Sequence, residues 1–210
     1  MRVTTETKAA TRQRILEAAQ ELFAKKGYEA TTTRDIAQAA GIAIGTLFNY
    51  FATKEAIVAC LVNDRFIGGQ QEFEEREAET ASLEEQLFAY VAAVLRKLKP
   101  LRTHLPALLE TTLCPLASTR NSEEADSLRT THLEKVQQLV TGHGLAESLS
   151  AVAIQLYWTL YTGVLAFWAN DKSPKQEDTL ALLDQSIEMF VGWLRSQTGN
   201  SKPQPRSKRS

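Results

Sequence analysis

The feature that most constrains this chain is the spacing of its apolar residues, which recur every three or four positions. The first such stripe is Ile15, Leu16, Ala19, Leu22 and Phe23, and it is followed by Lys25, Lys26 and Gly27. This spacing places side chains on one face of an α-helix, and glycine after basic residues is a typical helix end. No segment alternates apolar and polar residues over the length of a strand. The sequence therefore predicts an all-α fold.

Capping and breaking residues divide the chain into further helices. Thr32 with Asp35 forms a capping box, Thr53 is a second N-cap, and Gly68-Gly69 is expected to interrupt or loosen the helix that Thr53 starts. The polar residues after this glycine pair are expected to form a frayed end and a connection. We expect helices over about 8–26, 33–40, 44–51, 54–68, 82–98, 101–113, 122–142, 146–169 and 175–197.

The net charge of −1 conceals an uneven distribution along the chain. Residues 1–54 hold eight Lys and Arg against five Asp and Glu, residues 55–198 hold twelve against twenty, and residues 199–210 hold four against none. A basic head on an acidic body favours an anionic partner for the head, although so few charges also suit a solvated surface. The basic tail, poor in apolar residues, is expected to be disordered.

Several classes of protein are disfavoured by what the sequence lacks. It has no run of about 18 apolar residues, and its first residues are charged, so we expect no membrane span, no secretory signal and a cytoplasmic location. Cys60 and Cys114 are isolated, as buried free thiols are. His104, His132 and His143 have no metal-ligand spacing, and we expect neither a metal nor a cofactor.

The stretch AAGIAIGTLFNY, residues 39–50, has the pattern of a helix-turn-helix. Apolar side chains fall where two steeply crossing helices meet, at Ile36, Ala40, Ile42, Leu47 and Tyr50. Ala37 permits close approach, and Gly41 suits the left-handed backbone of a tight turn. Residues 44–51 would then be the recognition helix. The alternative is an ordinary corner between two helices of a helical enzyme.

The outward side of this element favours DNA over a plain corner. Gly45 leaves room for a close approach of the backbone, and Thr46 and Asn49 offer hydrogen-bonding groups on one side. Lys54 at the start of a helix is unfavourable for the helix dipole, which a nearby phosphate would explain. Arg34 could reach a phosphate or remain solvated.

The run TTTRDIAQAAGIAIGTLFNYFATKEAIV resembles the DNA-binding signature of the tetracycline-repressor (TetR) family, and residues 8–62 carry the resemblance. The resemblance implies that Thr32, Tyr50 and Lys54 contact phosphates. It also implies that four residues face base edges, namely Ile44, Gly45, Thr46 and Asn49. Two positions depart from the family pattern. Ala43 stands where many members have a hydroxyl cap, and Phe48 replaces a common tyrosine, so we expect ring packing or apolar contact there.

The helix expected over 146–169 is apolar nearly all round and needs two packing partners. One is the core of its own chain, and a second copy of the chain suits the other. The TetR resemblance implies a four-helix dimer interface formed by this helix and the last one. The residues expected in it are Thr159, Gly163, Ala166, Leu183, Ile187, Phe190 and Leu194.

A binding site for a small apolar or aromatic effector is the least visible feature. Its candidate lining residues are Phe88, Tyr90, His104, His132, Tyr157, Trp158 and Trp168, which helical spacing also suits to a plain core. Glu110 could pair with a cationic ligand or be a surface carboxylate.

Together these features predict three parts: a three-helix DNA-binding domain at 1–54, a larger helical effector-binding and dimerisation domain at 55–198, and the tail at 199–210. The expected function is a homodimeric, ligand-responsive repressor on a pseudo-palindromic double-stranded DNA operator. One alternative is a nucleoid or division protein that binds DNA without an effector. The more remote alternative, a helical enzyme, lacks any catalytic motif in the sequence.

Overall fold

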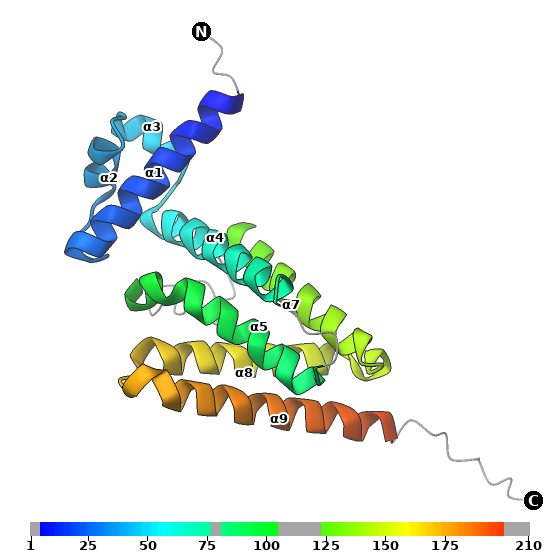
Figure 1. Ribbon diagram of the computed structural model, residues 1–210. Coiled ribbons are helices and arrows are strands. Elements are labelled where there is room, and N and C mark those ends of the chain that lie inside the picture. The colour runs from blue at the N-terminus through cyan, green and yellow to red at the C-terminus, as the bar shows by residue number, and fades with distance from the viewer. Residues whose placement is uncertain (1–4, 77–80, 105–122, 200–210) are drawn as a thin grey trace, which may run out of the picture. The chain divides into compact units, whose positions relative to one another are not determined.

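The computed structural model describes residues 5–76, 81–104 and 123–199 (Figure 1). Helices and turns make up these ranges, with no strand among them, which confirms the all-α fold. The α-helices are α1 (Thr5–Lys26), α2 (Thr33–Ala39), α3 (Ile44–Phe48), α4 (Lys54–Glu74), α5 (Leu83–Leu98), α7 (Glu123–Gly142), α8 (Ala151–Asn170) and α9 (Glu177–Gly199). Three short 3₁₀ helices complete the set: η1 (Lys99–His104), η3 (Ala146–Ser148) and η4 (Pro174–Gln176).

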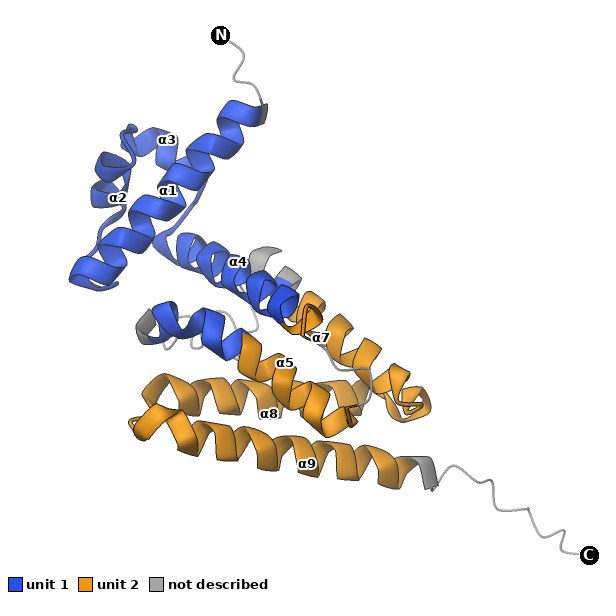
Figure 2. Cartoon of the chain, viewed as in Figure 1, with its two compact units in different colours: residues 1–72, 94–128 blue, residues 73–93, 129–210 orange. Residues whose placement is uncertain are grey.

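The chain divides into two compact units, coloured separately in Figure 2. Unit 1 comprises residues 1–72 and 94–128, and unit 2 comprises residues 73–93 and 129–210. Most of α4 groups with the N-terminal helices, so the division does not coincide with the boundary expected after residue 54. The expected domain limits remain a prediction.

The core of unit 1 forms where the stripe of α1 meets the next three helices. Ile15, Leu16 and Phe23 are buried with Ile36 of α2 and Leu47 of α3. At the surface, the Arg65 guanidinium of α4 donates to the Gln20 amide oxygen of α1 at 3.1 Å. This packing holds α2 and α3 against α1, and α1 begins at Thr5, three residues earlier than expected.

Helix α4 continues through the glycine pair that was expected to interrupt or loosen it. A Cβ atom on Gly69 would lie 2.7 Å from the Val94 Cα of α5, whereas one on Gly68 would have nothing within 4 Å. Beside this contact, Glu72 pairs with Arg96 at 3.0 Å and with Lys97 at 3.2 Å. Gly69 is therefore the point at which two helices of unit 1 touch, and this packing outweighs the low helix propensity of glycine.

In unit 2, α8 and α9 run side by side (Figure 1) and are joined by a hydrogen-bonded corner. The Asp171 carboxylate accepts the Thr179 side-chain and backbone donors, the latter at 3.1 Å, and the Ser173 N–H at 2.7 Å. These bonds, led by the one from the Thr179 hydroxyl, lower the pKa of Asp171 to about 2. Lys175 and Gln176 have φ values of 52° and 63°, which is why α9 starts at Glu177, two residues later than expected.

Among the described helices, α8 is long and apolar enough to cross a membrane by length and composition, and 39% of its apolar stretch is buried. The core helices of globular proteins pass the same test, so this property carries little weight. Cys60 is a buried thiol, as expected, and Cys114 lies outside the described residues.

Candidate nucleic-acid interface

The start of α2 is built around the expected capping box. The Thr32 hydroxyl accepts the Asp35 N–H at 3.1 Å, and the Asp35 carboxylate accepts the Thr32 N–H at 2.9 Å. The same carboxylate oxygen pairs with the Lys26 ammonium of α1 at 2.7 Å. The bond from Lys26, followed by those from Thr32, holds the pKa of Asp35 well below its usual value. The exposed Thr32 is therefore held in place by Asp35. The salt bridge between Asp35 and Lys26 was not anticipated from the sequence.

The turn after α2 has the hydrogen bonds of a Schellman motif. The Ile42 N–H donates to the Ala37 carbonyl at 3.0 Å, and the Gly41 N–H donates to the Gln38 carbonyl at 3.1 Å. Gly41 has a φ of 67°, the left-handed conformation that was expected there. This turn sets the direction of α3.

Helix α3 is attached by one fully buried side chain, Leu47. Its N-cap is Ala43, with no side-chain cap bond, as expected from the missing hydroxyl. The helix ends at Phe48 rather than Phe51, and Asn49 follows in a helical conformation, with φ −72° and ψ −17°. The recognition element is therefore about one and a half turns of helix, and it packs against the rest of the unit through its Leu47 side.

The opposite side of α3 is open. A Cβ atom on Gly45 would have nothing within 4 Å. Asn49 is exposed, and Thr46 and Tyr50 are half-buried. Ile44 and Phe48 are 37% and 49% exposed, so the Phe48 ring points outward instead of packing inside the unit. The structure thus brings the predicted base-facing residues together on one accessible surface.

Lys54 makes contacts inside unit 1 that the sequence did not indicate. Its ammonium donates to the backbone carbonyls of Tyr28 at 2.9 Å and Thr31 at 3.1 Å, and lies 3.8 Å from the centroid of the Tyr28 ring. The Tyr28 hydroxyl donates to the Glu55 carboxylate at 2.8 Å. Lys54 therefore ties the loop before α2 to the start of α4. The Thr53 cap of α4 is confirmed, with the Ala56 N–H 3.1 Å from its hydroxyl.

Arg34 is exposed in the first turn of α2, next to the capping box. With Thr32, Tyr50 and Lys54 it makes up the set predicted to contact phosphates. Two of these four, Thr32 and Lys54, have their polar groups partly engaged within the chain, while Arg34 is accessible.

The interior of unit 2 is organised around a buried histidine. His132 of α7 lies between two tyrosine hydroxyls, with Nδ1 3.2 Å from that of Tyr90 and Nε2 2.9 Å from that of Tyr157. The Tyr161 ring stacks on the imidazole at a centroid distance of 4.0 Å. Burial lowers the pKa of His132 to about 3, so the ring is neutral at pH 7. A neutral imidazole donates to one hydroxyl and accepts from the other, and both ring nitrogens are satisfied.

Within the part of the chain that the structure describes, this core leaves little room for a ligand. The small cavity beside it has a volume of about 10 Å³ and is lined by Tyr157, Tyr161, Phe190 and mostly aliphatic neighbours. Of the expected pocket residues, His132, Trp158 and Trp168 are core side chains, and Tyr157 alone lines this cavity. The His104 side chain and all of Glu110 lie outside the described residues. Tyr90, also expected there, belongs to the buried network.

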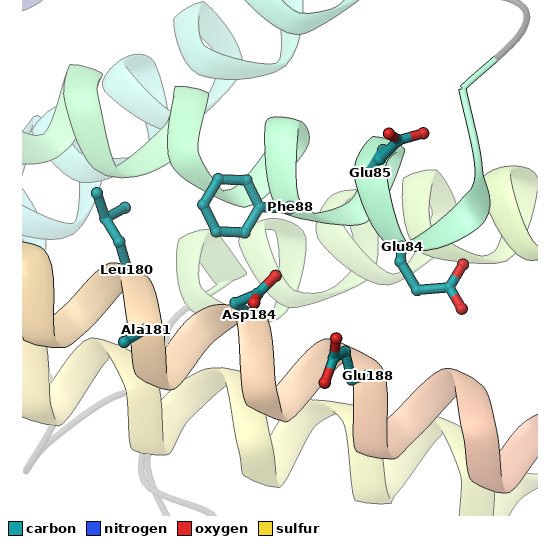
Figure 3. Close-up of a pocket in the computed structure, with 7 residues that line it drawn as sticks. All are labelled: Glu84, Glu85, Phe88, Leu180, Ala181, Asp184 and Glu188. Atoms are coloured by element: carbon teal, nitrogen blue, oxygen red, sulfur yellow. The ribbon is translucent and has the colours of Figure 1, made fainter.

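Phe88 lies elsewhere, in an open groove of about 640 Å³ between α5 and α9. Figure 3 shows its ring beside Leu180, with the Asp184 and Glu188 carboxylates of α9 nearby. Glu84 and Glu85 line the α5 side, and Glu84 also pairs with Arg195. Phe88 therefore does not share a pocket with the buried aromatic residues.

The expected dimer residues fall into two groups. Thr159, Gly163 and Ala166 are exposed on α8. Leu183, Ile187, Phe190 and Leu194 are at most 4% exposed and fill the interior of unit 2, which removes them from any surface interface. The large apolar residues exposed on the two helices are Val152 and Phe167 of α8 and Leu180, Leu182 and Met189 of α9. Apolar spacing on α9 thus marks the face toward its own core, and the dimer interface itself remains a prediction.

Comparison with known proteins agrees with this geometry. Residues 15–61 match the profile of bacterial regulatory proteins of the tetR family, and residues 86–201 match that of the tetracyclin repressor-like C-terminal domain. The chain is 45% identical over 53 residues to the HTH-type transcriptional regulator YvkB of Bacillus subtilis, covering 25% of this chain and 28% of that protein. It is 48% identical over 54 residues to the HTH-type transcriptional repressor KstR2 of Rhodococcus jostii, covering 26% of each. The aligned part thus spans about a quarter of these relatives.

Two solved structures resemble nearly the whole chain. The TetR-family transcriptional repressor FadR of Thermus thermophilus, solved in complex with lauroyl-CoA, matches with a TM-score of 0.68 and 19% identity, covering 95% of this chain and all of that one. The fatty acid degradation regulator FadR of Bacillus halodurans matches with a TM-score of 0.58 and 22% identity, covering 88% and 96%. At such identities the likeness shows the fold. With the C-terminal match alone extending over more than half of its length, the chain belongs to the TetR family, a family of bacterial regulatory proteins and not of enzymes.

Proposed function

We propose that this chain is a ligand-responsive transcriptional repressor that binds a pseudo-palindromic DNA operator as a homodimer. The observation that carries the proposal is the open face of α3, with Leu47 buried on one side and Gly45 free of any neighbour on the other. A short helix held from behind by a Schellman turn can enter the major groove with its outer side chains against the bases. The cytoplasm is the location that this function requires.

The roles of the individual residues follow from their positions. Gly45 lets the α3 backbone approach the bases, and Thr46 and Asn49 supply hydrogen bonds to their edges. Thr32 and Arg34 at the start of α2 and Tyr50 just after α3 would contact phosphates, as sequence reasoning proposed. The Lys54 ammonium donates two of its three hydrogen bonds to the carbonyls of Tyr28 and Thr31, so one donor remains for a phosphate. Its larger contribution is to hold the loop that carries Thr32.

A homodimer is supported by the surface of α8. This helix contains no charged residue over its 20 positions, yet Val152, Thr159, Gly163 and Phe167 are exposed in the single chain. An uncharged, partly apolar helix face needs cover, and a two-fold axis through α8 and α9 would supply the same face of a second copy. Two copies would present two α3 helices to half-sites about 34 Å apart, roughly one turn of DNA.

The effector is proposed to be apolar and to act through the C-terminal unit. The FadR structure of Thermus thermophilus contains lauroyl-CoA, which makes a long-chain acyl-CoA the first ligand to test. The cavity of about 10 Å³ is far too small for such a molecule. To regulate DNA binding, the effector would have to bind one arrangement of the dimer more tightly than another, the two differing in the distance between their DNA-binding domains. Addition of lauroyl-CoA, with free coenzyme A as control, should raise the melting temperature of the protein and release DNA.

The same small cavity favours a second function, a DNA-bound interaction protein without an effector. A filled core with a satisfied His132 network is what that function would have. No shift of melting temperature and no release of DNA with any acyl-CoA tested would favour this alternative over the ligand-responsive repressor.

DNA recognition can be tested without knowing the operator. The full-length chain is used to select duplexes from a random library, and the enriched sequence should be an inverted repeat. The double variant Thr46→Ala/Asn49→Ala should bind the selected site more weakly by about 30-fold or more, since it loses two base contacts that are each worth about 1–3 kcal/mol. Its affinity for unrelated duplexes should stay unchanged, because phosphate contacts are retained.

The matched control removes two exposed polar side chains of α7, Gln138→Ala/Thr141→Ala. It should select the same site with wild-type affinity. Unchanged sequence preference in the Thr46/Asn49 variant would refute the base-reading roles, and failure of the wild-type chain to enrich any sequence would refute the proposed function.

A further inference from the structure

The accessible surface of α3 has two chemically different flanks. At about 100° per residue, the residues opposite the buried Leu47 are Gly45 and Asn49. One flank beside them carries Thr46 and Tyr50, and the other carries Ile44 and Phe48. The first flank offers hydroxyl groups, and the second offers only hydrocarbon.

The apolar flank is exposed to a degree that calls for a partner. Ile44 and Phe48 are 37% and 49% exposed, and among the described residues of unit 1 the only other large apolar side chain this exposed is Ile67. The two side chains are four positions apart on one helix and are therefore neighbours. Two adjacent apolar groups at a binding face lose contact with water when a partner covers them, which stabilises the complex.

The major groove offers one apolar group for such a surface, the C5-methyl of thymine. Phosphates and the other base edges present charge or hydrogen-bonding groups, which neither Ile44 nor Phe48 can pair with. Phe48 has no hydroxyl to donate to a phosphate, and its ring does not pack inside the unit.

We infer that Ile44 and Phe48 form an apolar flank of the recognition helix that reads thymine methyl groups in each operator half-site. The inference rests on the proposed function, since it requires α3 to lie in the major groove. It adds a specificity element to the hydrogen bonds of Thr46 and Asn49: the half-site contains a thymine on the side of the helix where Ile44 and Phe48 project.

The test uses deoxyuridine, which pairs like thymidine but lacks the methyl group. Each thymine of the operator selected by the full-length chain is replaced in turn, and affinity is measured by fluorescence anisotropy. Replacement at one or two positions in each half-site should weaken binding about fourfold, the factor expected for one buried methyl group. Replacement outside the half-sites should have no effect and serves as the DNA control.

The protein side of the test is a double-mutant cycle. In Phe48→Ala or Ile44→Ala the uracil penalty at the contacted thymine should disappear, whereas Phe48→Tyr, which keeps the ring, should retain it. Thr46→Ala, on the opposite flank, is the matched control and should lose affinity overall while keeping the full penalty. Because both apolar side chains are partly exposed, the variants should keep the circular dichroism of the wild type and a melting temperature close to it.

Three results would overturn the inference in distinguishable ways. If no uracil replacement changes the affinity of the wild type, no methyl group is read. If the penalty persists unchanged in both Phe48→Ala and Ile44→Ala, uracil acts through the shape of the DNA and not through these side chains. If no sequence is selected at all, the proposed function fails first, and the inference fails with it.

Discussion

The two units of the molecule treat their polar side chains in opposite ways. In unit 1, Thr46, Asn49 and Arg34 lie at or near the surface, a few residues from the turn at Gly41. In unit 2, His132 and Tyr157 are buried and satisfy each other's hydrogen bonds. An exposed polar group is available to another molecule, whereas a satisfied buried one stabilises and orders its own core. The comparison teaches that the polar residues of unit 2 are first of all structural.

The largest expected effect is the loss of the buried imidazole. His132→Ala would leave a cavity and two tyrosine hydroxyls without their partner, which should reduce the free energy of unfolding by about 3–5 kcal/mol. The matched control is His143→Ala, which removes an exposed histidine bonded to Gln86 and should cost about 1 kcal/mol or less. Urea denaturation measures both. Equal effects of the two substitutions would contradict the conclusion that the buried His132 has a structural role that an exposed histidine lacks.

The second effect is a dependence of stability on pH. The pKa of His132 is lowered by burial to about 3, below its unfolded value of about 6.5, so the unfolded chain binds a proton that the folded chain refuses. The contribution of neutral His132 is fully present above pH 6.5 and is lost as pH falls toward 3. The free energy of unfolding should drop by about 1.4 kcal/mol per pH unit in that range. His132→Gln should flatten the slope between pH 6 and 5, before carboxylates titrate, and an unaltered slope would contradict the assignment.

The third effect concerns the glycine pair of α4. Gly69→Ala would place a methyl group against the Val94 backbone and should destabilise the protein by about 1–3 kcal/mol. Gly68→Ala, one residue away and free of neighbours, should stabilise the helix by about 0.5–1 kcal/mol. Thermal unfolding of the two variants should therefore shift in opposite directions. If both variants shift the melting temperature in the same direction, both glycines act only by lowering the stability of α4, and the close contact of Gly69 with Val94 has no effect.

The smallest effect is expected at Lys54. Lys54→Met removes two hydrogen bonds to carbonyls and the contact with the Tyr28 ring, and should lower the free energy of unfolding by about 1–2 kcal/mol. If Lys54 also meets a phosphate, the dependence of DNA affinity on salt should decrease by about one counterion. Lys25→Met, an exposed lysine of α1, is the control for stability. A normal melting temperature with a reduced salt slope would make Lys54 a phosphate ligand alone.

Sequence reasoning predicted the local structure around α2 and α3 because its determinants are local. The capping box of Thr32 and Asp35, the left-handed Gly41 and the uncapped Ala43 depend on residues at most four positions away. Such short-range hydrogen bonds and backbone preferences can be read directly from spacing. The roles assigned to individual residues in DNA contact remain predictions.

The contacts that sequence reasoning did not anticipate join residues far apart in the chain. Lys54 bonds to carbonyls 23 and 26 positions earlier, and His132 meets Tyr90 across 42 positions. Gly69 was expected to interrupt or loosen a helix because its partner Val94 could not be known from the sequence. On α9, the apolar spacing of Leu183 and Phe190 identified the buried face but not what would cover it. Periodicity specifies a face, and only the fold specifies the neighbour.

The claim that unit 1 presents α3 to DNA is tested most directly at Gly45. A Cβ atom there meets nothing within 4 Å and the residue is helical, so Gly45→Leu should fold with at least wild-type stability. The leucine would fill the space into which the bases must come, and affinity for the selected operator should fall on the order of 100-fold, as when both base contacts are prevented. Gly142→Leu, at an equally open glycine of α7, is the control and should bind normally. Wild-type affinity of a correctly folded Gly45→Leu chain would contradict the account.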